Sequence, residues 1–407
     1  MTDRITLDQF TAEAQAFLEA RLPPRAQRGE FRWGEGEDTG VPLWEEPDSA
    51  EERARLEQSR AWRRQRFDAG YGWLDGPSEL GGAGLPAAYA RAYQRLERGF
   101  EVPDQSYFKL DHVVGPVVLK AGTSKIRAEV PRGLQRGDLV ACELFSEPEA
   151  GSDMFSARTR AKRDAGGWRV TGQKVWTSDA HLADIGIVFC RTGDEPGKSA
   201  FSAFVIDMRQ PGVQVVPLRQ MTGGAAFNEV YLDDAFVPDE ALLGEVGQGW
   251  YIVREILARE RAGIGAGMGR SGGGIANGER LIAMVQALRA AGDPLVRQQL
   301  IQVISGFWAA KQLGQQGSDL AAARFLSGDP AGLVGKLALS ANLRQAAELV
   351  SNVLAERLIA DTGEWGTYSW NSFLLGEPGV HIFAGTDEIV RNSLAERFLG
   401  MPRDKDQ

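Results

Sequence analysis

Residues 249–270 read GWYIVREILARERAGIGAGMGR, the most helix-like stretch of the chain. Its apolar residues recur at helical spacing and predict a helix with one buried face: Val253, Leu257, Ile264 and Met268. Glu260 lies on the same stripe, whereas Arg261 points to another side of the helix. Burying a carboxylate costs free energy unless a partner neutralises it. The cost is also tolerated where the raised pKa that burial causes serves a function. The residues alone favour a buried ion pair slightly over a base at Glu260.

Outward from this helix, the sequence divides into three parts. Residues 1–138 have helical periodicity, interrupted by a Gly/Pro-rich loop at 29–49 whose length is typical of functional, mobile or partner-wrapping segments. Residues 139–243 contain short β-branched and aromatic runs between turn residues, which predict a β-sandwich or barrel. Residues 244–407 return to long helical patterns, typical of a bundle. We therefore expect an α+β multidomain protein: a helical N-terminal domain, a central β-domain and a C-terminal helical bundle.

Charge and composition exclude several classes of function. The net charge of −9 without a basic block argues against nucleic acid and against an anionic membrane surface. No apolar run is long enough to span a membrane, and the N-terminus has no secretory signal. Cys142 and Cys190 lie in apolar runs and cannot form a disulfide framework, so we expect a reduced, cytoplasmic setting. None of the three histidines lies beside a cysteine pair or a second histidine, so we expect no metal.

Two motifs of the β-rich part could bind a ligand. LFSEPEAGSD, at 144–153, predicts a tight loop whose backbone N–H groups and Ser152 hydroxyl can hold a polar group, or equally an ordinary turn. KVWTSD, at 174–179, places an indole and two hydroxyls at a strand end. Trp176 offers a flat apolar wall and Ser178 a donor for an aromatic cofactor, although composition alone favours a core tryptophan.

A third motif, FAGTDEIVR at 383–391, lies before the last predicted helix. Thr386 is a good N-cap, and a helix N-terminus can face a polar or anionic group. Acidic residues already occupy the first turn, so ordinary capping is the simpler interpretation.

Taken in order, these motifs resemble the acyl-CoA dehydrogenase family. The family's first signature is similar to LFSEPEAGSD, with Glu149 at the usual glycine, and its flavin-facing strand pair is similar to GWRVTGQKVWTSDAHLAD. The strand and linker before its third domain are similar to NEVYLDDAFVPDEALLGEVGQGW, and its C-terminal signature to AGTDEIVRNSLAERFLG. The resemblance extends from about residue 50 to residue 403. It implies the family's three-domain fold with FAD held among the domains.

The resemblance also implies a reaction and a base. The family removes the α-proton of an acyl-CoA thioester while a hydride moves from the β-carbon to flavin N5. Most members place the basic glutamate just before the Gly-Thr of the C-terminal signature, where this chain has Ala384. The isovaleryl-CoA and long-chain branches instead place it in a Glu-Arg pair on the first long helix of the bundle. Glu260 and Arg261 stand at that place, so the resemblance implies that Glu260 is the base and that Arg261 lies at the substrate.

Further roles follow motif by motif from the same resemblance. Ser152 would contact the pantetheine arm of CoA. The flavin-binding residues would come from the two β-domain motifs, and those that meet the ADP half of FAD from the third motif: Phe145, Ser146, Trp176, Thr177, Ser178, Thr386 and Glu388.

The chain departs from the family at two motifs, one of which is the segment by which a neighbouring subunit grips the FAD pyrophosphate. Neither is recognisable, and several segments resemble bacterial dehydrogenases that act on steroid side chains, some of them heterotetramers. We expect a homo- or heterotetramer that passes electrons to an electron-transfer flavoprotein or a similar acceptor. Two alternatives stay open: a non-catalytic or half-site partner subunit of a heteromeric dehydrogenase, and a flavin oxidase or monooxygenase on the same fold.

Overall fold

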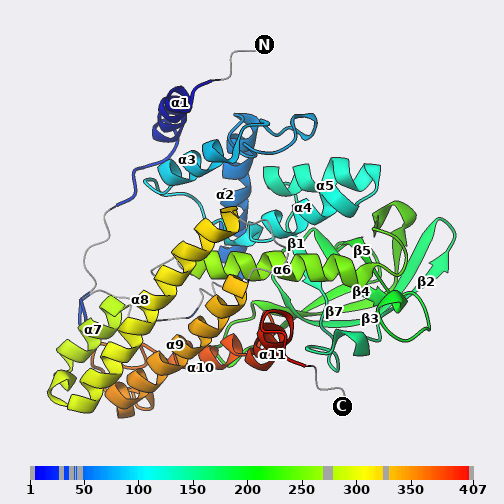
Figure 1. Cartoon of the computed structure of the whole chain (residues 1–407). Helices are drawn as coiled ribbons and strands as arrows, with labels where there is room; N and C mark the ends of the chain where they lie inside the picture. The colour runs from blue at the N-terminus through cyan, green and yellow to red at the C-terminus, as the bar shows by residue number, and fades with distance from the viewer. Residues whose placement is uncertain are drawn as a thin grey trace. The chain divides into compact units, whose positions relative to one another are not determined.

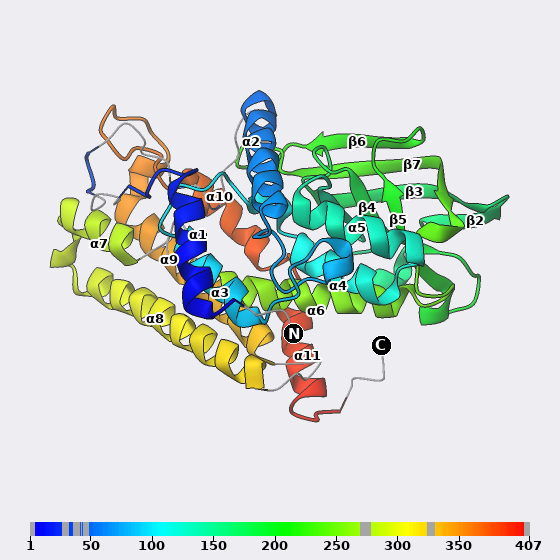
Figure 2. The ribbon, with the colours of Figure 1, turned by 90° about the horizontal axis from the view of Figure 1, so that it is seen from above.

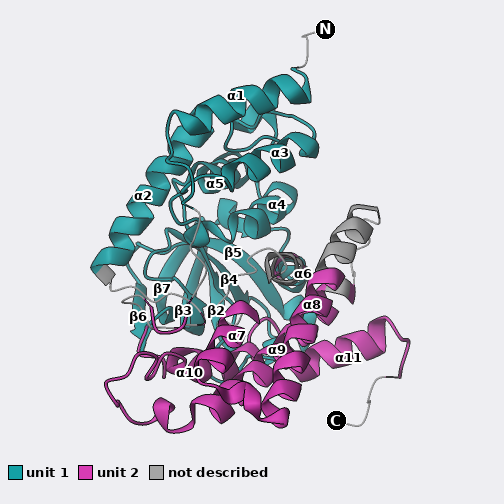
Figure 3. Ribbon diagram, turned by 90° about the vertical axis from the view of Figure 1, so that its left-hand side faces the viewer, with its two compact units in different colours: residues 1–27, 47–219, 225–256 teal, residues 28–46, 220–224, 257–407 magenta. Residues whose placement is uncertain are grey.

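The computed structural model describes residues 5–26, 32–35, 41, 43, 49–268, 278–323 and 330–402 (Figure 1). The chain divides into two compact units, coloured separately in Figure 3. Unit 1 comprises residues 1–27, 47–219 and 225–256, and unit 2 comprises residues 28–46, 220–224 and 257–407. Each unit therefore collects segments that lie far apart in the sequence.

The helical part of unit 1 has an apolar aromatic core. Its five α-helices are α1 Leu7–Glu19, α2 Ser49–Asp68, α3 Ala87–Glu97, α4 Asp111–Ala121 and α5 Ser124–Arg136. A capping box starts α1, because Thr6 Oγ1 accepts from Gln9 N and Gln9 Oε1 accepts from Thr6 N. Phe17, Trp62 and Tyr93 then pack α1, α2 and α3 into one cluster.

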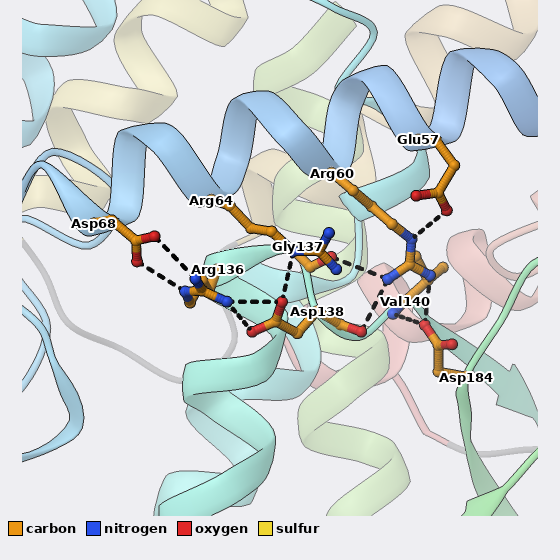
Figure 4. A network of polar contacts seen from close by, with 9 residues as sticks. All are labelled: Glu57, Arg60, Arg64, Asp68, Arg136, Gly137, Asp138, Val140 and Asp184. Carbon is orange, nitrogen blue, oxygen red and sulfur yellow. Dashed lines mark hydrogen bonds and ion pairs between the residues drawn. The ribbon is translucent and has the colours of Figure 1, made fainter.

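Arginines of α2 bind the two residues that follow α5, Gly137 and Asp138, as Figure 4 shows. The buried Arg60 donates to Gly137 O at 3.0 Å and Asp138 O at 2.9 Å, and its other nitrogen donates to Asp184 Oδ2 at 2.6 Å. Arg64 pairs with Asp138 at 2.8 Å nearer the surface. The last carbonyl groups of a helix lack intrahelical donors and carry partial negative charge. A guanidinium supplies both the missing hydrogen bonds and a positive charge.

We expect Arg60→Met to lower the free energy of unfolding by about 3 kcal/mol, because it leaves buried acceptors without their donor. Urea unfolding followed by circular dichroism measures this loss. Arg64→Met on the same helix is the matched control, since its more exposed ion pair should contribute no more than about 1 kcal/mol. Equal losses from the two variants would contradict a special role for the buried arginine.

The β-rich part of unit 1 forms one mixed sheet of eight strands. The strand order is β6-β7-β3-β2-β4-β5-β8, with β1 paired in parallel to β4, and Figure 2 shows β6, β7 and β3 side by side. The strands are β1 Ala141–Leu144, β2 Arg160–Asp164, β3 Gly167–Ser178, β4 Ile185–Arg191, β5 Phe201–Asp207, β6 Val213–Leu218, β7 Phe227–Pro238 and β8 Leu242–Leu243. The adjacent strands β4 and β5 are almost wholly buried, and the rings of Phe189 and Phe201 stack between them.

Helices dominate the described part of unit 2. Helix α6, Gly249–Met268, begins in unit 1 and ends in unit 2. The others are α7 Gly278–Ala287, α8 Pro294–Ala323, α9 Pro330–Leu354, α10 Asn371–Val380 and α11 Asp387–Arg397. Trp370 and Phe373 lie in the core of this unit together with apolar residues of α7, α8 and α9.

Described residues of the predicted 29–49 loop pack onto unit 2. Trp33 meets Trp365 edge to face, with ring centroids 4.9 Å apart. Val41 is buried, and its N–H donates to Ser369 O at 2.6 Å. Trp33 and Val41 therefore pack against Trp365 and Ser369 of their own chain, within unit 2, while residues 29–31, 36–40, 42 and 44–48 lie outside the described residues.

The predicted fold class is confirmed: helices come first, a β-domain lies in the middle, and helices follow. Helix α5 ends at Arg136 and α6 begins at Gly249, close to the expected boundaries. The division at 1–138, 139–243 and 244–407 stays a prediction. Within the described residues, no helix is long and apolar enough to cross a membrane.

Candidate functional site

A buried ion pair anchors the LFSEPEAGSD loop to the sheet. Lys174 of β3 has an exposed fraction of 0%, and its ammonium group has three acceptors. Lys174 Nζ donates to Glu147 Oε1 at 2.8 Å, to Phe145 O at 3.0 Å and to Phe189 O at 2.6 Å. An ammonium group has three donors, so every one of them is used.

Glu147 also organises the return of the loop. Its carboxylate accepts from Arg158 N at 2.6 Å and from Thr159 N at 3.0 Å. Desolvation raises the pKa of this carboxyl, but Lys174 and the hydrogen bonds together outweigh burial and leave the pKa below its ordinary value. The pair thus fixes both ends of the loop from inside the protein.

The loop places the three predicted residues differently. Phe145 is buried, and Lys174 engages its carbonyl oxygen. Ser146 is half-buried, and its carbonyl oxygen accepts from Val175 N at 2.9 Å. Ser152 is exposed at the far side of the loop. Both carbonyl groups near the strand are therefore engaged by the protein.

Trp176 is exposed, so the core-tryptophan interpretation is wrong. Its exposed fraction is 62%, and its backbone φ is 60° in the left-handed region, which costs free energy for a residue other than glycine. The pairing of β3 with β7 shifts register between Lys174 and Thr177, which explains the change of direction. The indole is thus available as a flat apolar wall, with the Phe227 ring at its edge.

The next two residues differ in burial. Thr177 is 1% exposed, and its Oγ1 has no hydrogen-bond partner among the described residues. Its carbonyl oxygen accepts from Asn228 Nδ2 at 3.0 Å. Ser178 is half-buried at the end of β3. An exposed indole followed by a half-buried hydroxyl fits a flat ring that also needs a hydrogen-bond donor.

The third motif lies in unit 2. Thr386 caps α11, because its Oγ1 accepts from Ile389 N at 3.3 Å. Glu388 is exposed, and hydrogen bonds from its own backbone and from the Thr386 hydroxyl lower its pKa. Ala384 and Gly385 precede the cap with φ values of 54° and 89°. Thr386 therefore caps α11 in the ordinary way, and the Glu388 carboxylate is exposed to a ligand that donates hydrogen bonds.

Glu260 is half-buried on α6. Val253 and Ile256 of the same helix are fully buried, and Leu257 is half-buried, so this part of the predicted stripe is confirmed. The side chains of Arg261, Ile264 and Met268 lie outside the described residues.

The predicted residues fall in both units of the structure. The β-domain motifs belong to unit 1, whereas Glu260, Thr386 and Glu388 belong to unit 2. The sequence analysis did not identify Glu147 and Lys174, the buried pair that anchors the LFSEPEAGSD loop. The alternation of β3 carried a signal, because Lys174 is in phase with the buried Trp168 and Val170. A lysine on the inward face of a strand needs a buried partner.

Within the described ranges, no group of three His, Cys, Asp or Glu side chains is placed to hold a metal ion.

Comparison with known proteins identifies the family. Residues 142–235 match the family model of the acyl-CoA dehydrogenase middle domain, and residues 247–399 match that of the C-terminal domain. Acyl-CoA dehydrogenase IpdE1 of Mycobacterium tuberculosis is 32% identical over 403 residues, which cover 98% of both chains. Acyl-CoA dehydrogenase FadE34 of the same organism is 35% identical over 336 residues, covering 78% of this chain and 44% of FadE34.

A solved structure, the Tcur3481-Tcur3483 steroid ACAD, shares the fold with a TM-score of 0.67. It is 23% identical in sequence and covers 99% of this chain and 100% of that chain. The chain belongs to the acyl-CoA dehydrogenase family. It is a flavin-dependent oxidoreductase of acyl-CoA thioesters, and its cofactor is FAD.

Proposed function

We propose that Glu260 is the base of an FAD-dependent α,β-dehydrogenation of an acyl-CoA thioester. The residue types found at two positions, Ala384 and Glu260, support this proposal most strongly. Ala384, at the usual place of the base, has no proton acceptor, while Glu260 is a half-buried carboxylate on a long helix. A base of a weakly acidic carbon needs a carboxylate held by a rigid element and shielded from water.

Each group of residues then has its own task. Glu260 takes the α-proton onto its carboxylate, and bound FAD supplies the hydride acceptor. Trp176 and Ser178 would form the wall and the hydrogen-bond donor for the flavin ring, beside Phe145, Ser146 and Thr177. Thr386 and Glu388 would meet the ADP half, where an exposed carboxylate suits hydroxyl or amino donors and repels phosphate. Ser152 would contact the pantetheine arm, and Arg261 the substrate beside the base.

Anaerobic mixing with acyl-CoA tests this function against its alternatives. Purified enzyme should be yellow and should bleach, whereas a non-catalytic partner subunit would keep its colour or bind no FAD. Peroxide formed in proportion to turnover would instead indicate an oxidase or monooxygenase. An electron-transfer flavoprotein should restore the colour of the bleached enzyme.

The proposed acyl group is bulky, branched or ring-bearing, because the structural neighbour with the same fold is titled a steroid dehydrogenase. We expect kcat/KM for cyclic and branched acyl-CoA thioesters to exceed that for butyryl- and octanoyl-CoA by at least about tenfold, the scale of one or two well-filled apolar contacts. An assay with an artificial electron acceptor measures kcat/KM for each acyl-CoA thioester. Faster turnover of both straight chains than of every bulky thioester would contradict the assignment.

The proposed assembly is a homo- or heterotetramer, and in a heterotetramer a different chain would supply the missing pyrophosphate segment. The name of the structural neighbour pairs two proteins, which supports a heteromeric form.

A further inference from the structure

Four charged or titratable side chains of unit 2 meet in one buried cluster. They come from α9, the end of α10 and the start of α11. Lys336 is 1% exposed, Asp387 6% and Glu377 8%, and His381 is half-buried between them. Glu377, His381 and Asp387 flank the Ala384–Gly385 turn in the sequence. None of the four residues belongs to the proposed catalytic or cofactor-binding groups.

Both ring nitrogens of His381 face carboxylates. Nδ1 lies 2.7 Å from Asp387 Oδ2, and Nε2 lies 2.7 Å from Glu377 Oε1. The ionised Asp387 carboxylate only accepts hydrogen bonds, so Nδ1 carries a hydrogen, while Nε2 and Glu377 Oε1 share one further proton between them.

The charge balance supports the same state. Lys336 Nζ donates to Asp387 Oδ1 at 2.5 Å. Burial raises the pKa of Asp387, but hydrogen bonds from Lys336, His381 and Ser340 outweigh it and lower the pKa to about 2, so this carboxyl is ionised at neutral pH. The Asp387 carboxylate and the Lys336 ammonium cancel, and the His381–Glu377 pair adds no net charge when it shares one proton, so the buried cluster is neutral.

The cluster holds a strained turn. Asp387 N donates to His381 O at 3.1 Å, and Lys336 Nζ lies 3.5 Å from the same oxygen. Between these anchors, Ala384 has a φ of 54°. A left-handed alanine costs about 1 kcal/mol or more and persists only where its surroundings over-determine it. Arg391, the other charged group near the cluster, is mostly exposed and 4.0 Å from Asp387.

We propose that His381 acts as a positioning residue that holds a carboxyl group at each of its ring nitrogens. With Lys336 it fixes residues 384–386, and hence the first turn of α11, in the arrangement that receives FAD. The role toward FAD rests on the proposed function of Thr386 and Glu388. The hydrogen bonds of the ring rest on the cluster alone.

Long-range ¹H–¹⁵N spectra of the apoprotein test the hydrogen bonds of the ring without any cofactor. The chain has three histidines, and His381→Gln assigns the signal by its disappearance. We expect Nδ1 of His381 to carry a hydrogen, because the Asp387 carboxylate that it faces only accepts. A His381 ring without a hydrogen on Nδ1 would overturn the proposal, whatever the enzyme catalyses.

Paired variants test the positioning role. His381→Gln leaves the buried Glu377 carboxyl without its partner, and we expect it to raise the Kd for FAD by about tenfold or more, the scale of a lost charged hydrogen bond. Adding Glu377→Gln replaces that carboxyl by a neutral amide and should bring the Kd most of the way back. His112→Gln, at an exposed histidine, should leave the Kd unchanged.

Calorimetric titration of each apoprotein with FAD gives these constants, and thermal melts report folding. A Kd for His381→Gln equal to that of the parent would refute the positioning role, as would a folded double variant no better than the single one. If the parent itself binds no FAD, the proposed function fails, while the spectra still decide the state of His381.

Discussion

Glu260→Gln should reduce the rate of flavin bleaching by acyl-CoA by roughly three orders of magnitude or more, the effect of removing an essential base. The amide keeps the size and the hydrogen-bonding capacity of the carboxyl but cannot accept the α-proton. FAD content and acyl-CoA binding should stay close to those of the parent. Anaerobic stopped-flow absorbance, read beside a thermal melt, measures the loss.

Two comparisons make this prediction specific to the base. Adding Ala384→Glu to Glu260→Gln should recover part of the rate, because the family reaches the same α-carbon from either position. A structural ion pair at Glu260 would instead lower the melting temperature and reduce activity only in proportion to folded protein. A stable Glu260→Gln enzyme that bleaches at the parent rate would end the assignment.

Lys174→Met should lower the free energy of unfolding by about 3–5 kcal/mol, because it leaves the Glu147 carboxylate buried without its counter-ion. It also leaves the carbonyl oxygens of Phe145 and Phe189 without a donor. Since Phe145 begins the proposed flavin-binding loop, FAD should be lost during purification. Urea unfolding and the ratio of flavin to protein absorbance measure the two effects.

The double variant Lys174→Met/Glu147→Gln should regain at least half of that stability. The amide introduced by Glu147→Gln could accept from Thr159 N and donate to a carbonyl oxygen that Lys174 serves in the parent. Lys162→Met, at an exposed lysine of β2, is the matched control and should change stability by no more than about 0.5 kcal/mol. A double variant less stable than Lys174→Met would show that the pair contributes through more than its charge.

The same pair predicts acid sensitivity. The folded pKa of Glu147 lies below its ordinary value of 4.5, so its contribution to stability is present above pH 4.5. That contribution is lost as the pH falls through the lowered folded pKa.

Local patterns predicted the fold because each describes neighbours in sequence. Helical spacing located α6, turn residues separated the strands, and Thr386 was recognised as a cap from its place before acidic residues. Trp176 was harder, because its exposure follows from a register shift against β7, a distant partner.

Pairings between distant residues could not be predicted in the same way. Lys174 and Glu147 are joined by the topology of the sheet, and Lys336 reaches Asp387 only after α9 and α10 have packed. Their residue types signalled a need for partners, but nothing local identified which partners they would find. The division of the site residues between the two units likewise depends on contacts between distant segments, which the sequence does not show.

Val41 binds Ser369 across roughly 330 residues of sequence. At a synthesis rate of about 5–20 residues per second, the ribosome needs on the order of 20–60 seconds to make that stretch. Until then Trp33 and Val41 have no docking surface, although α1 on one side of them and α2 on the other can already fold. The final closure of unit 2 therefore belongs to the end of translation, and a chain that stops before Trp365 keeps two apolar side chains open to chaperones and to aggregation.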